Sequence, residues 1–149
     1  APPYQVVGAF SLEAADLMAH ALSGMKIQRA FVVHGALGWD EATPIGPYDL
    51  FDVRPGQVVH TQRDPQDVGL PRCTAQDLAG GDAAFNASAL EGLLRGTPGP
   101  YQDAACLAAG LALEVCGLAA DHESAIALAR SSILEGRTAT LLAALRGSQ

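Results

Sequence analysis

The sequence predicts an α/β domain in which helices flank a mixed, mainly parallel sheet. The opening segment reads as strand, helix, strand, and this order implies a right-handed crossover between two parallel strands. Two more β patterns follow, joined by a proline–glycine turn, and only helical patterns occur beyond residue 62. The length of 149 residues suits one domain of this class.

The predicted crossover begins with an apolar run at 5–10, which indicates a buried strand. Ser11 can cap the following helix, because its hydroxyl accepts a hydrogen bond from a free N–H of the first turn. Gly24 is expected to end that helix. A second apolar run at 29–34 predicts the next strand. Ligands of such sheets bind beyond the carboxyl ends of the strands, so the loop after this strand is the first candidate site.

A hairpin is predicted from two β patterns at 48–53 and 57–62. Pro55 and Gly56 stand between them, in the order that a type II turn requires. We therefore expect these two strands to pair antiparallel.

The helical half of the chain is marked by capping residues. Asp64-Pro65 and Thr74 are expected to open short helical turns, and Asp82 to cap a longer helix. The longest apolar helix is expected to begin at Gly99-Pro100, with Ala104, Leu107, Leu111 and Val115 on its buried side. The predicted helices span about 83–95, 100–116, 121–135 and 138–145, and Asp121 is expected to begin the third of them.

Composition and charge exclude several classes of protein. Apolar residues make up 49% and charged residues 17%, which indicates a folded chain rather than a disordered one. The net charge is −7 and the basic residues are scattered, so we expect no nucleic-acid partner, because a basic face supplies most of that affinity.

The sequence also bears on where in the cell the protein lies. It holds no signal peptide and no apolar run of membrane-spanning length, so we expect a cytoplasmic protein without a membrane partner.

The number of cysteines is odd, and they lack the spacing of metal ligands, which favours free thiols at Cys73, Cys106 and Cys116. The chain opens at Ala1-Pro2 directly before a strand, and we expect it to be a piece of a longer polypeptide.

The loop at 35–47 carries the best candidate site, the carboxylate pair Asp40-Glu41. Mg²⁺ is usually bound through one or two carboxylates together with waters and substrate phosphates. The alternative is a solvated acid pair at a helix start. His34 could orient a substrate or be satisfied by local backbone, and Trp39 could wall a pocket or pack on the domain.

Five segments in order resemble anthranilate phosphoribosyltransferases over essentially the whole chain. The most specific is V-V-H-G-x-x-G-x-D-E at 32–41. The others are Q-V-V-G at 5–8, D-x-G-L-P-R at 67–72, G-G-D-x-x-x-N at 80–86 and G-P-x-x-D-A at 99–104.

This resemblance implies a fold and an activity. The fold would be the large α/β domain shared with nucleoside phosphorylases, and residues 1–149 would be its C-terminal part. The family transfers the phosphoribosyl group of phosphoribosyl pyrophosphate to anthranilate in tryptophan biosynthesis, with Mg²⁺ steadying the pyrophosphate. By motif, Asp40 and Glu41 would be the Mg²⁺ ligands.

The resemblance also implies what lies outside these residues. The family's phosphoribosyl pyrophosphate loop and its N-terminal helical domain, which forms the homodimer, are absent from residues 1–149. We therefore expect this chain alone to be inactive.

Departures from the family pattern leave alternatives open. Trp39, Tyr48 and Ala108 stand where the family usually has other residues, so the exact acceptor substrate is left open at this point. A non-catalytic binding module of the same fold, or a related nucleoside phosphorylase domain, is the alternative.

Overall fold

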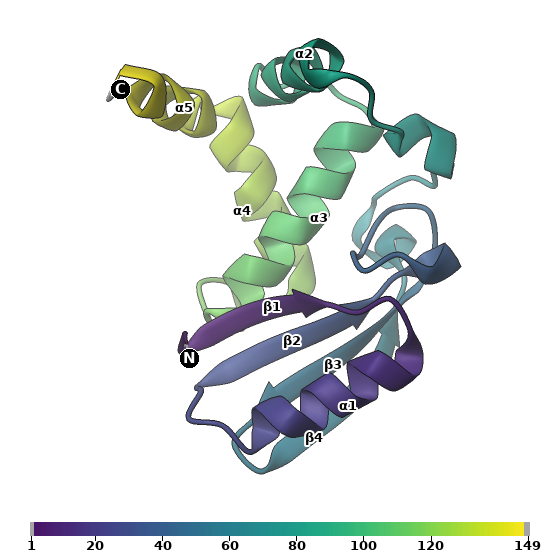
Figure 1. Ribbon diagram of the computed structural model, residues 1–149. Coiled ribbons are helices and arrows are strands. Elements are labelled where there is room, and N and C mark those ends of the chain that lie inside the picture. Colours follow the sequence, from purple (N-terminus) through teal and green to yellow (C-terminus); the bar gives the residue numbers. More distant parts are fainter. Residues whose placement is uncertain (1, 148–149) are drawn as a thin grey trace.

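A computed structural model describes residues 2–147 of the chain. A four-stranded sheet carries one helix on one face, and the other helices rise from the opposite face (Figure 1). The predicted α/β class with a mixed sheet is confirmed.

The first crossover forms as predicted. Strand β1 (Tyr4–Gly8) and strand β2 (Arg29–His34) pair in parallel, and helix α1 (Leu12–Ser23) joins them. The Ser11 hydroxyl accepts a hydrogen bond of 3.1 Å from the N–H of Ala14, which satisfies one of the free donors of the first turn.

The hairpin also forms, from strand β3 (Tyr48–Arg54) and strand β4 (Gln57–Arg63). Gly56 between them has a φ of 74°, as the third residue of a type II turn requires. Because β3 also pairs antiparallel with β2, the sheet β1-β2-β3-β4 has one parallel and two antiparallel pairings. Within the described residues the sheet is therefore less parallel than predicted, since a hairpin fills half of it.

Alternation along β2 divides the interior into two cores. Phe31 and Val33 face one core, which helix α3 (Pro100–Val115) covers, and Ala30 and Val32 face the other, which α1 covers. Successive side chains of a strand point to opposite faces, so β2 is buried on both sides.

The helical segments that follow the hairpin begin at the predicted caps Asp64, Thr74 and Asp82. The helices are α2 (Ala83–Leu94), α4 (His122–Leu134) and α5 (Arg137–Gly147), with one-turn 3₁₀ helices η2 (Pro65–Val68) and η3 (Ala75–Leu78) before them. The cap side chains of Asp64, Thr74, Asp82 and Asp121 each accept a hydrogen bond from a backbone N–H.

Helix α3 packs as its residue pattern predicts. Leu107, Leu111 and Val115 are buried, whereas Ala104 is half-buried. A Cβ added at Gly110 would lie 2.9 Å from a side-chain carbon of Ile126, so the glycine lets α4 cross α3 closely.

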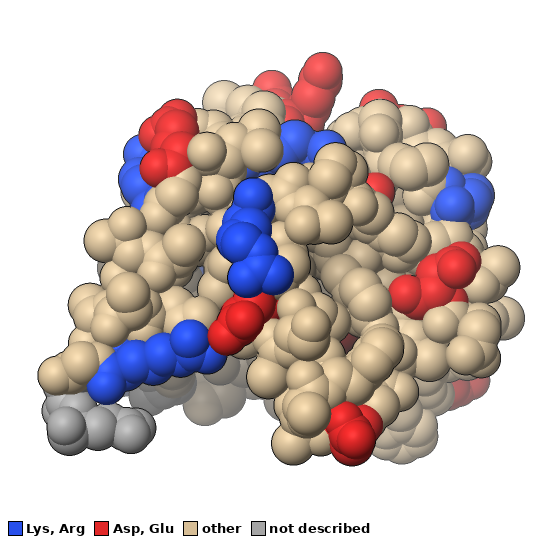
Figure 2. Space-filling model, turned by 90° about the horizontal axis from the view of Figure 1, so that it is seen from above, with Lys and Arg blue, Asp and Glu red and all other residues tan. Residues whose placement is uncertain are grey.

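No helix within residues 2–147 is both long enough and apolar enough to cross a membrane. On the face shown in Figure 2, Lys and Arg side chains lie scattered among acidic and uncharged residues rather than gathered into one patch.

Candidate functional site

The loop after β2 turns back on itself before it reaches the acid pair. It begins with a 3₁₀ turn, η1 (Ala36–Gly38), in which Leu37 and Gly38 have φ values of 60° and 81°. The N–H of Gly35 then donates a hydrogen bond of 2.7 Å to the carbonyl of Trp39. This reversal places Asp40 and Glu41 beyond the carboxyl ends of β1 and β2.

Two glycines allow the backbone of the acid pair to lie directly on these strand ends. A Cβ added at Gly8 would lie 1.7 Å from the carbonyl oxygen of Asp40, and a Cβ added at Gly35 would lie 2.0 Å from that of Glu41. Any side chain at either position would displace the loop, because real Cβ atoms do not approach backbone oxygens so closely. The side chains of Asp40 and Glu41 are exposed.

A hollow of about 330 Å³ opens beside the pair. Val6 and Gly8 of β1 line one side, and Ala108 and Leu111 of α3 line another. The two carboxylates are thus set at the rim of a concave surface between the sheet edge and a helix.

The donor set of this hollow suits a hard divalent cation. Within residues 2–147, no group of three or more His, Cys, Asp or Glu side chains could hold a metal ion, so a closed structural zinc site is not formed there. Two exposed carboxylates beside an open hollow fit Mg²⁺, which keeps waters and shares its coordination with substrate phosphates. Asp40 and Glu41 are the residues that would hold it.

His34 directly precedes the loop, and Trp39 lies within it. Nδ1 of His34 lies 2.9 Å from the carbonyl oxygen of Ala9, which ties the end of β2 to the residue after β1. This contact supports the local structural interpretation of His34. Trp39 is half-buried, and its carbonyl closes the turn to Gly35.

The Gly80-Gly81-Asp82 segment serves as a capping turn. The side chain of Asn86 accepts a hydrogen bond of 2.9 Å from the N–H of Gly81 and donates one of 3.0 Å to its carbonyl. Asp82 accepts one from the N–H of Phe85. These bonds agree with the predicted role of Asp82 as the cap of this helix.

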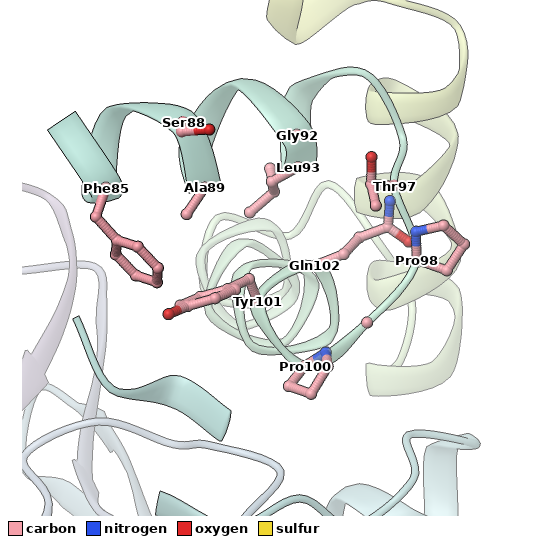
Figure 3. Close-up of a pocket in the computed structure, with 11 residues that line it drawn as sticks. Phe85, Ser88, Ala89, Gly92, Leu93, Thr97, Pro98, Pro100, Tyr101 and Gln102 are labelled. Atoms are coloured by element: carbon pink, nitrogen blue, oxygen red, sulfur yellow. The ribbon is translucent and has the colours of Figure 1, made fainter. Parts of the chain in front are cut away.

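A second hollow, of about 340 Å³, lies between α2 and the start of α3. Its walls are mostly apolar, and Figure 3 shows the rings of Phe85 and Tyr101 facing the space between the two helices. The Tyr101 hydroxyl donates a hydrogen bond of 2.6 Å to the carbonyl of Ala79, outside this space.

A buried ionic cluster, which the sequence patterns did not predict, lies on the α3 side of the sheet. Arg63 at the end of β4 donates hydrogen bonds of 2.7 and 2.8 Å to the two carboxylate oxygens of Glu114 on α3. Nδ1 of His122 lies 3.4 Å from the same carboxylate, and its Nε2 lies 3.0 Å from the hydroxyl of Tyr48. One signal was available: Glu114 interrupts the apolar stripe between Leu111 and Val115.

Two members of the cluster have strongly shifted pKa values, for different reasons. Burial alone would raise the pKa of Glu114, but the bonds and charges of Arg63 and His122 outweigh it and hold the pKa at about 2. Burial raises the pKa of the Tyr48 phenol to about 12. Glu114 is therefore a buried, paired carboxylate whose charge depends on its partners.

A family model described as the a/b domain of a glycosyl transferase family matches residues 1–139. The chain belongs to this glycosyl transferase family. Membership agrees with the α/β fold described above. The resemblance to anthranilate phosphoribosyltransferases stated from the sequence is confirmed by the relatives that follow.

Curated relatives of this glycosyl transferase chain include anthranilate phosphoribosyltransferases. That of Rhodopseudomonas palustris (strain BisA53) is 43% identical over 141 residues, which are 95% of this chain and 42% of the relative. That of Desulforudis audaxviator is 43% identical over 135 residues, with coverage of 91% and 39%. The chain thus spans about two fifths of the length of these relatives.

Solved structures show the same fold. The anthranilate phosphoribosyltransferase of Thermus thermophilus superimposes with a TM-score of 0.79 at 35% identity, and the match covers 91% of this chain and 40% of that enzyme. The Saccharomyces cerevisiae enzyme in complex with PRPP and Mg superimposes with a TM-score of 0.80 at 24% identity, over 89% of this chain and 39% of its own.

Proposed function

We propose that residues 1–149 are the C-terminal part of the α/β domain of an anthranilate phosphoribosyltransferase. The whole enzyme would transfer the phosphoribosyl group of phosphoribosyl pyrophosphate to anthranilate in tryptophan biosynthesis. The main observation behind this proposal is the acid pair Asp40-Glu41, whose backbone lies against Gly8 and Gly35 at the sheet edge. Its support is the 43% identity to enzymes of that name.

The part played by this chain would be to hold the metal and shape its surroundings. Asp40 and Glu41 would bind Mg²⁺ through their exposed carboxylates, and the close backbone seat on Gly8 and Gly35 would fix where those carboxylates stand. The cation would supply positive charge against the departing pyrophosphate. Val6, Ala108 and Leu111 would give the hollow an apolar wall.

Other parts of the reaction would depend on residues outside this chain. The phosphoribosyl pyrophosphate loop and the N-terminal helical domain of the family would complete the substrate sites and the homodimer. We propose a cytoplasmic location, as for a biosynthetic enzyme. Phosphoribosyl pyrophosphate and anthranilate would be the substrates of that complete protein.

A metal titration tests the proposal on the chain as it stands. Mn²⁺ replaces Mg²⁺ as the probe, with inorganic pyrophosphate present, and binding is followed by electron paramagnetic resonance. Asp40→Asn and Glu41→Gln keep the side-chain shape but remove a charged ligand. Each is expected to weaken Mn²⁺ binding at least about tenfold, in line with the effect of disturbing metal-ligand shells.

The matched control is Glu123→Gln, because Glu123 is an exposed carboxylate in the first turn of α4, away from the hollow. It should bind Mn²⁺ as tightly as the unaltered chain. Equal affinity in the Asp40 and Glu41 variants would instead favour a non-catalytic domain that kept the fold.

A second measurement asks whether this chain turns over. With phosphoribosyl pyrophosphate, anthranilate and Mg²⁺, we expect no loss of anthranilate fluorescence beyond the protein-free rate, because the family's phosphoribosyl pyrophosphate loop is not in these residues. Measurable turnover by the 149-residue chain would contradict this division of the site.

A further inference from the structure

Helix α3 forms one wall of the hollow beside the acid pair. Ala108 and Leu111 lie on this wall, opposite Val6 and Gly8 of β1. The width of the hollow therefore depends on where α3 lies relative to the sheet.

Apolar side chains of α3, among them Leu107 and Leu111, pack on the sheet and hold the helix against it. Glu114, one helical turn beyond Leu111, makes directional hydrogen bonds that fix the orientation of α3 on the sheet. Its two carboxylate oxygens accept bonds of 2.7 and 2.8 Å from Arg63 of β4. A bidentate guanidinium–carboxylate pair fixes both distance and orientation.

A second bond anchors the backbone of the same residue. The guanidinium of Arg29 on β2 donates a hydrogen bond of 2.9 Å to the carbonyl of Glu114. Arg29 is itself held by Asp52 of β3, at 2.9 and 2.7 Å. Side chains from two strands, β2 and β4, thus bond to one turn of α3, and Asp52 of a third strand holds one of them.

The structure assigns to Glu114 the role of a positioning residue for the metal site. It does not touch the hollow, but it sets α3, and through Leu111 and Ala108 it sets the wall against which a metal-bound pyrophosphate would lie. The assignment rests on the proposed function, since it concerns that same site. Metal sites with loosely held surroundings lose affinity when their supports shift by about 1 Å.

The test uses a paired substitution that avoids leaving a buried charge alone. Arg63→Met with Glu114→Leu replaces the ion pair by apolar side chains, a change that often leaves folding stability near neutral. Mn²⁺ is titrated in the presence of pyrophosphate, and the fluorescence of Trp39, the single tryptophan and the neighbour of Asp40, reports binding by paramagnetic quenching.

We expect the paired variant to melt as a folded protein and to bind Mn²⁺ about fivefold more weakly than the unaltered chain, within the range seen for residues that act through packing. The control is Asp103→Asn, which removes the 3.0 Å ion pair between α3 and Arg130 of α4 but no bond to the sheet. The control should bind Mn²⁺ with unchanged affinity.

The outcomes separate the two proposals. If the unaltered chain fails to bind Mn²⁺ with pyrophosphate, the metal site itself is refuted. If the unaltered chain binds and the paired variant binds equally well, Glu114 only stabilises the fold and the positioning role is overturned. Equal weakening in Asp103→Asn would also overturn it, because any disturbance of α3 would then suffice. Should the paired variant not fold, the single variant Glu114→Gln carries the same comparison.

Discussion

At the scale of single residues, the place of the acid pair is decided by two positions that carry no side chain. Gly8 ends β1 and Gly35 directly follows the parallel strand β2, and the backbone carbonyls of Asp40 and Glu41 occupy the space where the Cβ atoms of these glycines would be. The sequence predicted a site in the loop after the second strand, but it could not show that Gly8, thirty-two residues before Asp40, lies against the same loop.

Gly8→Ala is expected to displace the loop, because the new Cβ would lie 1.7 Å from the Asp40 carbonyl oxygen. We predict a loss of about 1–3 kcal/mol in the free energy of unfolding, as for overpacked sites, and weaker Mn²⁺ binding. Urea unfolding and the metal titration measure both. Gly24→Ala is the control, since its Cβ would meet its nearest atom at an ordinary 3.6 Å. Unchanged Mn²⁺ affinity in Gly8→Ala would show that the close seat is not needed.

Glu114 makes the fold sensitive to acid. Its pKa in the folded protein, about 2, lies below its ordinary value of 4.5, so its stabilisation is complete above about pH 5 and is lost as the pH falls through 4.5 toward 2. The shift corresponds to a contribution on the order of 3 kcal/mol. Urea unfolding between pH 2 and 7 should show this loss.

Glu114→Gln removes the titrating group, so its stability should fall less steeply over the same pH range. A weaker slope should remain, because hydrogen bonds also lower the pKa of the capping residues Asp64, Asp77 and Asp121. Identical pH profiles for Glu114→Gln and the unaltered chain would refute the assignment.

At the scale of helices and strands, local signals predicted most of the fold. Ser11, Thr74 and Asp82 cap helices as expected, because a cap depends on a few neighbouring residues, and Asp121 caps the helix it was expected to begin. The ionic cluster escaped prediction because Arg63 and Glu114 lie 51 residues apart, a separation that no local pattern can bridge. A sequence motif identified Asp40 and Glu41 as candidate site residues. Their role as metal ligands stays a prediction.

The crossing of α3 and α4 offers a test at this scale. Gly110→Val would place a branched side chain where even a Cβ lies 2.9 Å from Ile126, so the helices must separate. We predict a loss of about 2 kcal/mol and a lower Tm by calorimetry. Ala109→Val on the exposed side of the same helix is the control, and it should change the Tm little. A Tm in Gly110→Val equal to that of the control would mean the crossing is not tight.

At the scale of the whole molecule, burial is uneven. Strand β2 is covered on both faces, whereas none of the residues of α2 or α5 is buried. Regions with few buried contacts open at lower free energy than the core. The chain is thus expected to unfold locally at the helices far from the sheet (Figure 1).

Hydrogen exchange should reveal this gradient. The amides of β2 are expected to exchange only through global unfolding, and those of α2 and α5 at much lower free energies. Mass spectrometry of peptides from each segment measures the difference, with the capped and partly buried α1 as an intermediate reference. Equal protection of α2 and β2 would contradict the expected gradient.

The strand order has a geometric consequence for the acid pair. β1 is the outermost strand on its side of the described sheet, and the backbone of Asp40 lies against Gly8 at the carboxyl end of this strand. The acid pair therefore stands at a corner, where the row of strand ends meets the open rim. A further strand laid parallel to β1 would lengthen that row by one place, and its own carboxyl end would arrive as the next neighbour of Asp40 and Glu41.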